Sequence, residues 1–114
     1  MTRDEILAMP SGREMDVLIA KKLDLFRKHP KQGDYFLTEN HIHIGYVPQF
    51  STDISAAWEV VDKFYSMTLD KYSDGSEWRV YLVTERDGKN VDAHAVADTA
   101  ALAICRAALL AVMK

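Results

Sequence analysis

The sequence predicts an α+β protein, a three-layer α/β/α sandwich with the order α–ββ–α–ββ–α and a largely antiparallel four-stranded sheet. The first observation is that the alternating apolar segments fall into two hairpins, which favours one sheet covered by helices. The second is that both faces of the hairpin at 77–96 carry apolar side chains, which favours helices on two sides over an open sheet. The 114 residues are expected to form a single domain, 1–114, because chains of about 100–150 residues usually build one core.

Two short helices are predicted at the start of the chain. Residues 2–5 (Thr-Arg-Asp-Glu) and 11–14 (Ser-Gly-Arg-Glu) both fit the capping box, in which Ser or Thr caps forward and Glu reaches back. Met9-Pro10 separates the helices, because a residue before proline avoids the α region. His29-Pro30 is expected to end the second helix. Its apolar face has spacings of three and four: Met15, Leu18, Ile19, Leu23 and Phe26.

A hairpin and a third helix follow. Residues 35–37 and the alternating residues 41–47 predict two strands joined by a turn at 38–40. Ser51-Thr52-Asp53 then supplies N-cap oxygens for a helix from about Ile54 to Met67. The expected buried stripe of that helix has helical spacing: Ile54, Ala57, Trp58, Val61 and Tyr65.

The last third of the chain predicts a second hairpin and a final helix. Residues 77–85 alternate, Asp87-Gly88 is a tight-turn signal, and residues 91–96 return as the second strand. The side chains at 91, 93 and 95, which share one face of this strand, are small and would let a helix approach closely. Asp98 or Thr99 is expected to cap a helix that runs to about Met113. That helix is apolar all round except for Arg106, which predicts burial in the core or partly in a subunit interface.

Composition and charge exclude several classes of protein. With 48% hydrophobic and 27% charged residues the chain is globular rather than disordered. There are 14 Lys and Arg against 17 Asp and Glu, which argues against broad nucleic-acid binding. The apolar stretch 100–113 is too short to span a bilayer, which takes about 20 residues. The single Cys105 and the charged N-terminus, which lacks a signal sequence, predict a soluble intracellular protein.

One local exception to the acidic balance is the segment 21–31, which we call the basic segment. It has five Lys and Arg residues against one Asp. One interpretation is a patch that binds phosphate or another polyanion. The other, which we favour, is a solvated helix end, where cations offset the helix dipole.

Three stretches together resemble a known family. They are residues 12–20 (GREMDVLIA), 47–61 (VPQFSTDISAAWEVV) and 97–111 (ADTAALAICRAALLA). They are similar to the phage ABA-sandwich domain family of small bacteriophage and prophage proteins, although the segment 28–40 departs from its pattern. The resemblance implies a three-layer fold and a phage or prophage gene product in the bacterial host cytoplasm. It implies no established biochemical role, so no catalytic residue carries over.

Candidate metal and nucleophilic residues are few. His41 and His43 share one strand face and His94 could approach from the second hairpin, but two His at i, i+2 are a weak signal for zinc. Cys105 lies among apolar residues and is typical of a small core side chain rather than a nucleophile. We therefore expect no catalytic residue, no metal and no cofactor.

Arg106 is the most informative charged residue. A guanidinium in an apolar helix must pair, reach water or hold an anion. The structural interpretation is a salt bridge to Asp16, Asp53 or Glu59, or a side chain that extends to solvent. The functional interpretation is a clamp for phosphate or carboxylate, and the predicted ligand-binding residues are then Arg106, Tyr46 and Tyr81. Trp58 and Trp78 are expected in the core.

Three functions remain open at this stage. The first is a non-enzymatic protein-interaction module, expected to be a homo-oligomer or to bind a host or phage protein, because its apolar last helix is hard to hide completely in 114 residues. The alternative is a small-ligand protein that binds or sequesters a nucleotide-like anion. An enzyme ranks last, because no spacing in the sequence indicates a catalytic cluster.

Overall fold

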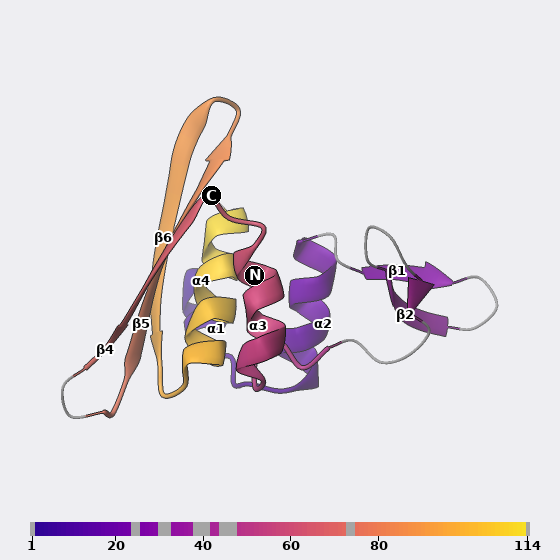
Figure 1. Cartoon of the computed structure of the whole chain (residues 1–114), viewed down its shortest axis with the longest axis horizontal. Helices are drawn as coiled ribbons and strands as arrows, with labels where there is room; N and C mark the ends of the chain where they lie inside the picture. The colour runs from indigo at the N-terminus through magenta and orange to yellow at the C-terminus, as the bar shows by residue number, and fades with distance from the viewer. Residues whose placement is uncertain are drawn as a thin grey trace.

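The computed structural model describes residues 2–23, 26–29, 33–37, 42–43, 48–72 and 75–113 (Figure 1). Its elements in chain order are α1 (Arg3–Ala8), α2 (Arg13–Lys22), β1 (Phe26–His29), β2 (Gly33–Leu37), β3 (Ile42–His43), α3 (Ile54–Val61), β4 (Ser66–Lys71), β5 (Trp78–Arg86), β6 (Lys89–Ala97) and α4 (Ala100–Met113).

The protein is α+β, but the predicted four-stranded sheet and the order α–ββ–α–ββ–α are wrong. The described strands form two separate three-stranded antiparallel sheets, β1-β2-β3 and β4-β5-β6. The predicted three layers are not found either. Figure 1 shows α4 against one face of β4–β6, with α1, α2 and α3 on the same side, while the small β1–β3 sheet lies at the far end beyond α2. No described residue forms a layer over the other face of β4–β6.

The two additional strands explain the error in topology. The predicted third helix continued to Met67, whereas α3 ends at Val61 and the chain turns into β4. Residues 66–71 (Ser-Met-Thr-Leu-Asp-Lys) alternate polar and apolar side chains, the period of a strand. β1 was assigned to the second helix, because Phe26 also fits helical spacing. The predicted pairing of the first hairpin is confirmed where it is described, at Leu37 opposite Ile42.

Of the N-terminal caps predicted for the first three helices, the structure confirms those of α1 and α3 but not that of α2. The capping box at α1 is confirmed: Glu5 N–H donates to Thr2 Oγ1, and Thr2 N–H donates to Glu5 Oε1. The box predicted at 11–14 is wrong, because the N-cap of α2 is Gly12 and no side chain caps it. Gly12 N–H instead donates to Ser51 Oγ, which ties α2 to the loop before α3. Asp53 caps α3 through Ser55 N–H, as predicted.

The second hairpin and the last helix form the centre of the core, as predicted. β5 and β6 are joined by a two-residue turn in which Asp87 and Gly88 both have positive φ, the conformation that Asp-Gly favours. Ala93 and Ala95 are buried, and these small side chains let α4 pack closely on the sheet. Thr99 Oγ1 accepts from Leu102 N–H at the start of α4. Ten α4 residues are buried, and they leave little apolar surface for a subunit interface.

The buried stripe predicted for the third helix is largely wrong. Ala57 is buried, but Ile54 and Trp58 are 41% and 45% exposed, and Tyr65 lies beyond the helix at 73% exposed. Val60, which was not predicted in the stripe, is fully buried instead. The helix therefore packs through a face rotated from the one that the spacing indicated.

Candidate binding surface

The uncovered side of the β4–β6 sheet, which we call the outer face, carries polar and aromatic side chains in rows. Strand pairing places Thr68 opposite Tyr81 and Tyr81 opposite His94, so the three share one row. The next row contains Asp70 and Arg79. Because side chains alternate along a strand, these residues point away from Val80 and Leu82, which are buried against the helices.

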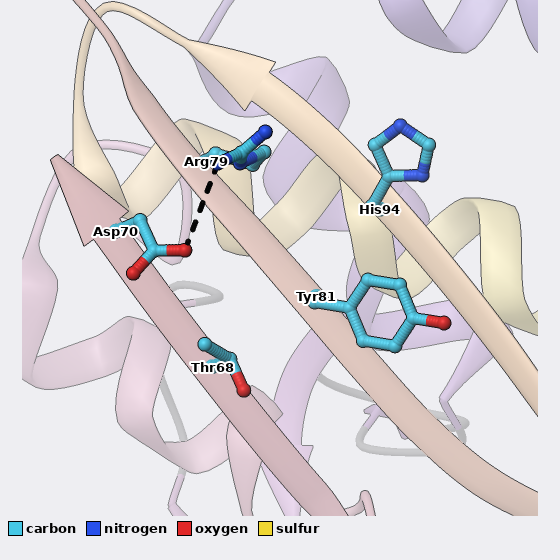
Figure 2. A pocket seen from close by; sticks show the side chains of 5 residues that line it. All are labelled: Thr68, Asp70, Arg79, Tyr81 and His94. Atoms are coloured by element: carbon cyan, nitrogen blue, oxygen red, sulfur yellow. Dashed lines mark ion pairs between the residues drawn. The ribbon is translucent and has the colours of Figure 1, made fainter. Parts of the chain in front are cut away.

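A shallow pocket of about 350 Å³ lies on the outer face, lined by Thr68, Asp70, Arg79, Tyr81 and His94 (Figure 2). The rings of Tyr81 and His94 have centroids 6.3 Å apart and an interplanar angle of 17°. Figure 2 shows both rings side by side on neighbouring strands. Tyr81 is 41% exposed. Two nearly parallel rings thus offer an aromatic surface to a partner in solution.

A hydrogen bond along the sheet holds the Tyr81 ring. Its phenol O–H donates to Asp92 Oδ2. The hydrogen bond to the Asp92 carboxylate, with smaller contributions from desolvation and the negative charge, raises the pKa of Tyr81 above its ordinary value of 10.0. The phenol therefore stays protonated at neutral pH and remains a donor.

The charges of the outer face are mainly negative. By strand register it carries the carboxylates of Asp70, Glu85 and Asp92 against the guanidinium of Arg79. Arg79 Nη2 lies 3.9 Å from Asp70 Oδ2, and the guanidinium carbon lies 5.6 Å from the centre of the Tyr72 ring. Exposed pairs of this kind are weak, about 0.2–1 kcal/mol. A cationic group therefore suits this surface better than an anion.

Arg106 connects three parts of the core. Nη1 donates to Val96 O and Nη2 to Met9 O, both at 3.0 Å, so the guanidinium links α4 to β6 and to the residue after α1. The predicted alternative of a salt bridge to Asp16, Asp53 or Glu59 is wrong. The Nε atom is buried and finds no acceptor among the described residues. A pocket of about 420 Å³ adjoins Arg106 and is also lined by Glu77 and Asp98, whose carboxylates oppose an anion.

The three predicted ligand-binding residues do not converge on one described site. Tyr81 lies on the outer face, whereas Arg106 lies on α4, on the covered side of the sheet. Tyr46 lies outside the described residues. The prediction missed Arg79, Asp70 and Thr68. The alternation along β5, which places Arg79 on the same face as Tyr81, was a signal for Arg79. Thr68 and Asp70 lie on β4, just after the segment that was predicted to be a helix.

The other candidates give no reactive centre. Among the described residues, no three His, Cys, Asp or Glu side chains are grouped to hold a metal ion. His94 is exposed beside Tyr81, the side chain of His43 and all of His41 lie outside what is described, and Cys105 is buried. Burial, and to a lesser degree the charge of Asp16, raise the pKa of the Cys105 thiol, so it stays neutral and unreactive.

The two tryptophans are less buried than predicted. Trp58 is an exposed residue of α3, and Trp78 on β5 is half-buried. Lys71 Nζ lies 5.2 Å from the centroid of the Trp78 ring, a cation–π contact. None of the described helices is long and apolar enough to cross a membrane.

Comparisons with known proteins found one family model and a similar solved structure. A family model described as the Phage ABA sandwich domain matches residues 17–109. A solved structure, the 2.0 Å crystal structure of a phage protein from Bacillus cereus ATCC 14579, is similar with a TM-score of 0.61. The two sequences are 26% identical over 90% of this chain and 91% of that chain. No curated protein matches this sequence.

Proposed function

The chain belongs to the Phage ABA sandwich domain family, and from this premise we propose that it is a non-enzymatic protein-interaction module of a phage or prophage. The partner binds the outer face of β4–β6, and the complex forms in the cytoplasm of the bacterial host. The observation that carries the proposal is the pair of outward rings, Tyr81 and His94, in a shallow pocket on a sheet face whose charged side chains are mainly carboxylates.

The shape and the chemistry of this face both favour a protein partner. A shallow surface on a sheet leaves most of a small ligand in water, whereas ligand sites usually bury most of the ligand. Aromatic side chains at the centre of a polar patch are typical of the residues that dominate protein interfaces. The exposed rings supply apolar contact area, and the surrounding carboxylates select partners with cationic side chains.

The proposal predicts that binding depends on the two rings. An immobilised chain is used to capture proteins from phage-infected bacteria, and the retained proteins are identified by mass spectrometry. The Tyr81→Ala/His94→Ala variant should retain its specific partner at least about tenfold more weakly, since hot-spot truncations cost about 2 kcal/mol or more.

The matched control for the capture experiment is Tyr65→Ala. Tyr65 is 73% exposed, more than the 41% of Tyr81, and it precedes β4, so its removal deletes an accessible ring away from the outer face. The control should retain the partner as the unmodified chain does. A partner that binds the ring-deleted variant as tightly as the unmodified chain would show that this face does not bind it.

The second candidate function is a small-ligand protein that binds or sequesters a nucleotide-like anion. The observation that favours it is the buried Nε of Arg106, which lacks an acceptor among the described residues. The carboxylates of Glu77 and Asp98 in the adjoining pocket count against it. Native mass spectrometry of the freshly purified chain tests it, because a bound compound adds mass that is lost on denaturation.

Arg106→Met separates the two roles of this guanidinium. The variant should fold, with a free energy of unfolding lower by about 2 kcal/mol and a Tm lower by about 8 °C, because hydrogen bonds to Val96 O and Met9 O are lost. Thermal unfolding followed by circular dichroism measures the change.

The control Arg106→Lys keeps the positive charge but lacks the planar guanidinium that donates to both carbonyls. Its Tm should also be lower than that of the unmodified chain. Loss of an added native mass in the Met variant would favour the ligand-binding function.

A further inference from the structure

We propose that the outer face of one copy binds the basic segment, residues 21–31, of a second copy, so that chains associate head to tail. The inference rests on the protein-interaction function proposed above and names the partner of the same face. Both halves of the interface are present in every chain, and they differ in sign of charge.

The two surfaces are complementary in charge. The outer face has three carboxylates, Asp70, Glu85 and Asp92, against one guanidinium. The basic segment has five Lys and Arg residues against one Asp. Opposite potentials on two surfaces favour their encounter and fix which surfaces meet. A nucleic-acid strand is disfavoured on the outer face, because its phosphates would meet three carboxylates.

The described part of the basic segment is accessible. Lys21 and Lys22 form the last turn of α2, and both are exposed. An ammonium group binds favourably over an aromatic face. The β4–β6 sheet already contains two such contacts, Lys71 over Trp78 and Arg79 over Tyr72. The Tyr81 ring offers another position of the same kind, next to the carboxylate of Asp92, which would neutralise a bound cation.

The position of the two surfaces requires a second copy. Figure 1 shows the β4–β6 sheet at one end of the longest axis and the C-terminal part of α2 with β1 toward the other. In the same figure α4 and α3 lie between the β4–β6 sheet and α2, so the two surfaces do not meet within one chain. A contact between unlike surfaces is heterologous and repeats from copy to copy, which gives closed rings or open filaments. The α2 region of one copy would cover the outer face of the next copy, the side of the sheet that the helices of that copy leave uncovered.

The test measures the mass of the full chain by light scattering in low-salt and high-salt buffer. The unmodified chain should exceed the 12.9 kDa monomer at low salt and approach it at high salt, because salt screens exposed charges. Lys21→Glu/Lys22→Glu breaks the basic segment, and Asp70→Lys/Glu85→Lys breaks the outer face. Each variant alone should be monomeric at low salt, with self-association weakened at least about tenfold.

An equimolar mixture of the two variants is the decisive sample. Each variant retains one intact half of the interface, so the mixture should associate again although neither component does so alone. The control Arg3→Glu/Lys63→Glu makes the same change in net charge as Lys21→Glu/Lys22→Glu, at exposed positions outside both surfaces. It should keep the mass of the unmodified chain. All four substituted surface positions are exposed, and circular dichroism verifies the fold of each variant.

Three outcomes would overturn the inference: a monomeric unmodified chain at low salt, a mixture that stays monomeric, or a control that dissociates like the variants. These outcomes are distinguishable from a failure of the proposed function. A chain that does not self-associate but captures another protein through Tyr81 and His94 would contradict only the head-to-tail assembly. A chain that does neither would contradict both.

Discussion

Ala107→Asp is expected to abolish the folded protein. Ala107 has no exposed surface and lies in the middle of α4, where Cys105, Ala108 and most neighbouring side chains are buried. An aspartate there places a carboxylate in the core, and a buried charge without a partner costs about 4–5 kcal/mol or more. The larger side chain also overpacks the site, at about 1–3 kcal/mol. Since a domain of this size is stable by about 5–15 kcal/mol, most of the margin is lost.

Urea unfolding and a two-dimensional NMR spectrum measure the effect of Ala107→Asp. The matched control is Ala100→Asp, which puts the same carboxylate in the first turn of α4, where the helix dipole favours negative charge. The control should fold with unchanged or slightly higher stability. An Ala107→Asp protein with the unmodified melting curve would show that α4 is not the core helix.

Asp16→Ala is expected to lower the free energy of unfolding by about 3 kcal/mol. The carboxylate is 4% exposed, and its Oδ1 accepts from Ser51 N–H at 2.8 Å and from Ser51 Oγ–H at 2.7 Å. Ser51 Oγ in turn accepts from Gly12 N–H at 2.9 Å. Removal of the carboxylate leaves the buried amide of Ser51 without its acceptor, and an unsatisfied buried donor costs about 1–3 kcal/mol.

A double-mutant cycle separates this contact from general effects of the substitution. Asp16→Asn keeps a side-chain oxygen that can accept from Ser51 N–H, and should cost only about 1 kcal/mol. Ser51→Ala, alone and combined with Asp16→Ala, gives the coupling energy between the two residues. Costs that simply add in the double variant would show that the two side chains do not stabilise each other.

The sequence predicted those elements whose signals are local. The Asp87-Gly88 turn fixes a hairpin within two residues, and the apolar run of α4 permits burial on every side. Thr2 and Glu5 form a capping box because the geometry needs only one helical turn. In these cases the residues that determine the structure are neighbours in the chain.

The secondary-structure predictions were wrong where contacts between residues far apart in the sequence determine the structure. The spacing from Ile54 to Tyr65 fits a helix, but the pairing of Tyr65 N–H with Val83 O begins a strand alignment that the local pattern does not contain. Residues 26–29 are polar enough to resemble a helix end, yet they pair with β2. The third layer implied by the family resemblance is not formed by the described residues of one chain.

In the candidate site, too, the sequence could indicate single residues but not the contacts between residues far apart in the chain. Tyr81 could be selected from the sequence because it stands out on an alternating strand. Its relation to Thr68 and Asp70 depends on β4, a strand that was not predicted. Arg106 was correctly identified as a residue that needs partners, but Val96 O and Met9 O are backbone atoms that no pattern of side chains indicates.

The central place of α4 has a consequence for how the protein is made. The helix contacts β5, β6 and all three other helices, yet it is the last described element to leave the ribosome. The elements made before it have no apolar layer to pack against until residues 100–113 emerge. Folding must therefore wait for the end of this segment, and α1, separated from α4 by most of the chain, joins through contacts of long sequence separation that form slowly. Until then the apolar side chains of β5 and β6 stay uncovered, and uncovered apolar surface favours aggregation.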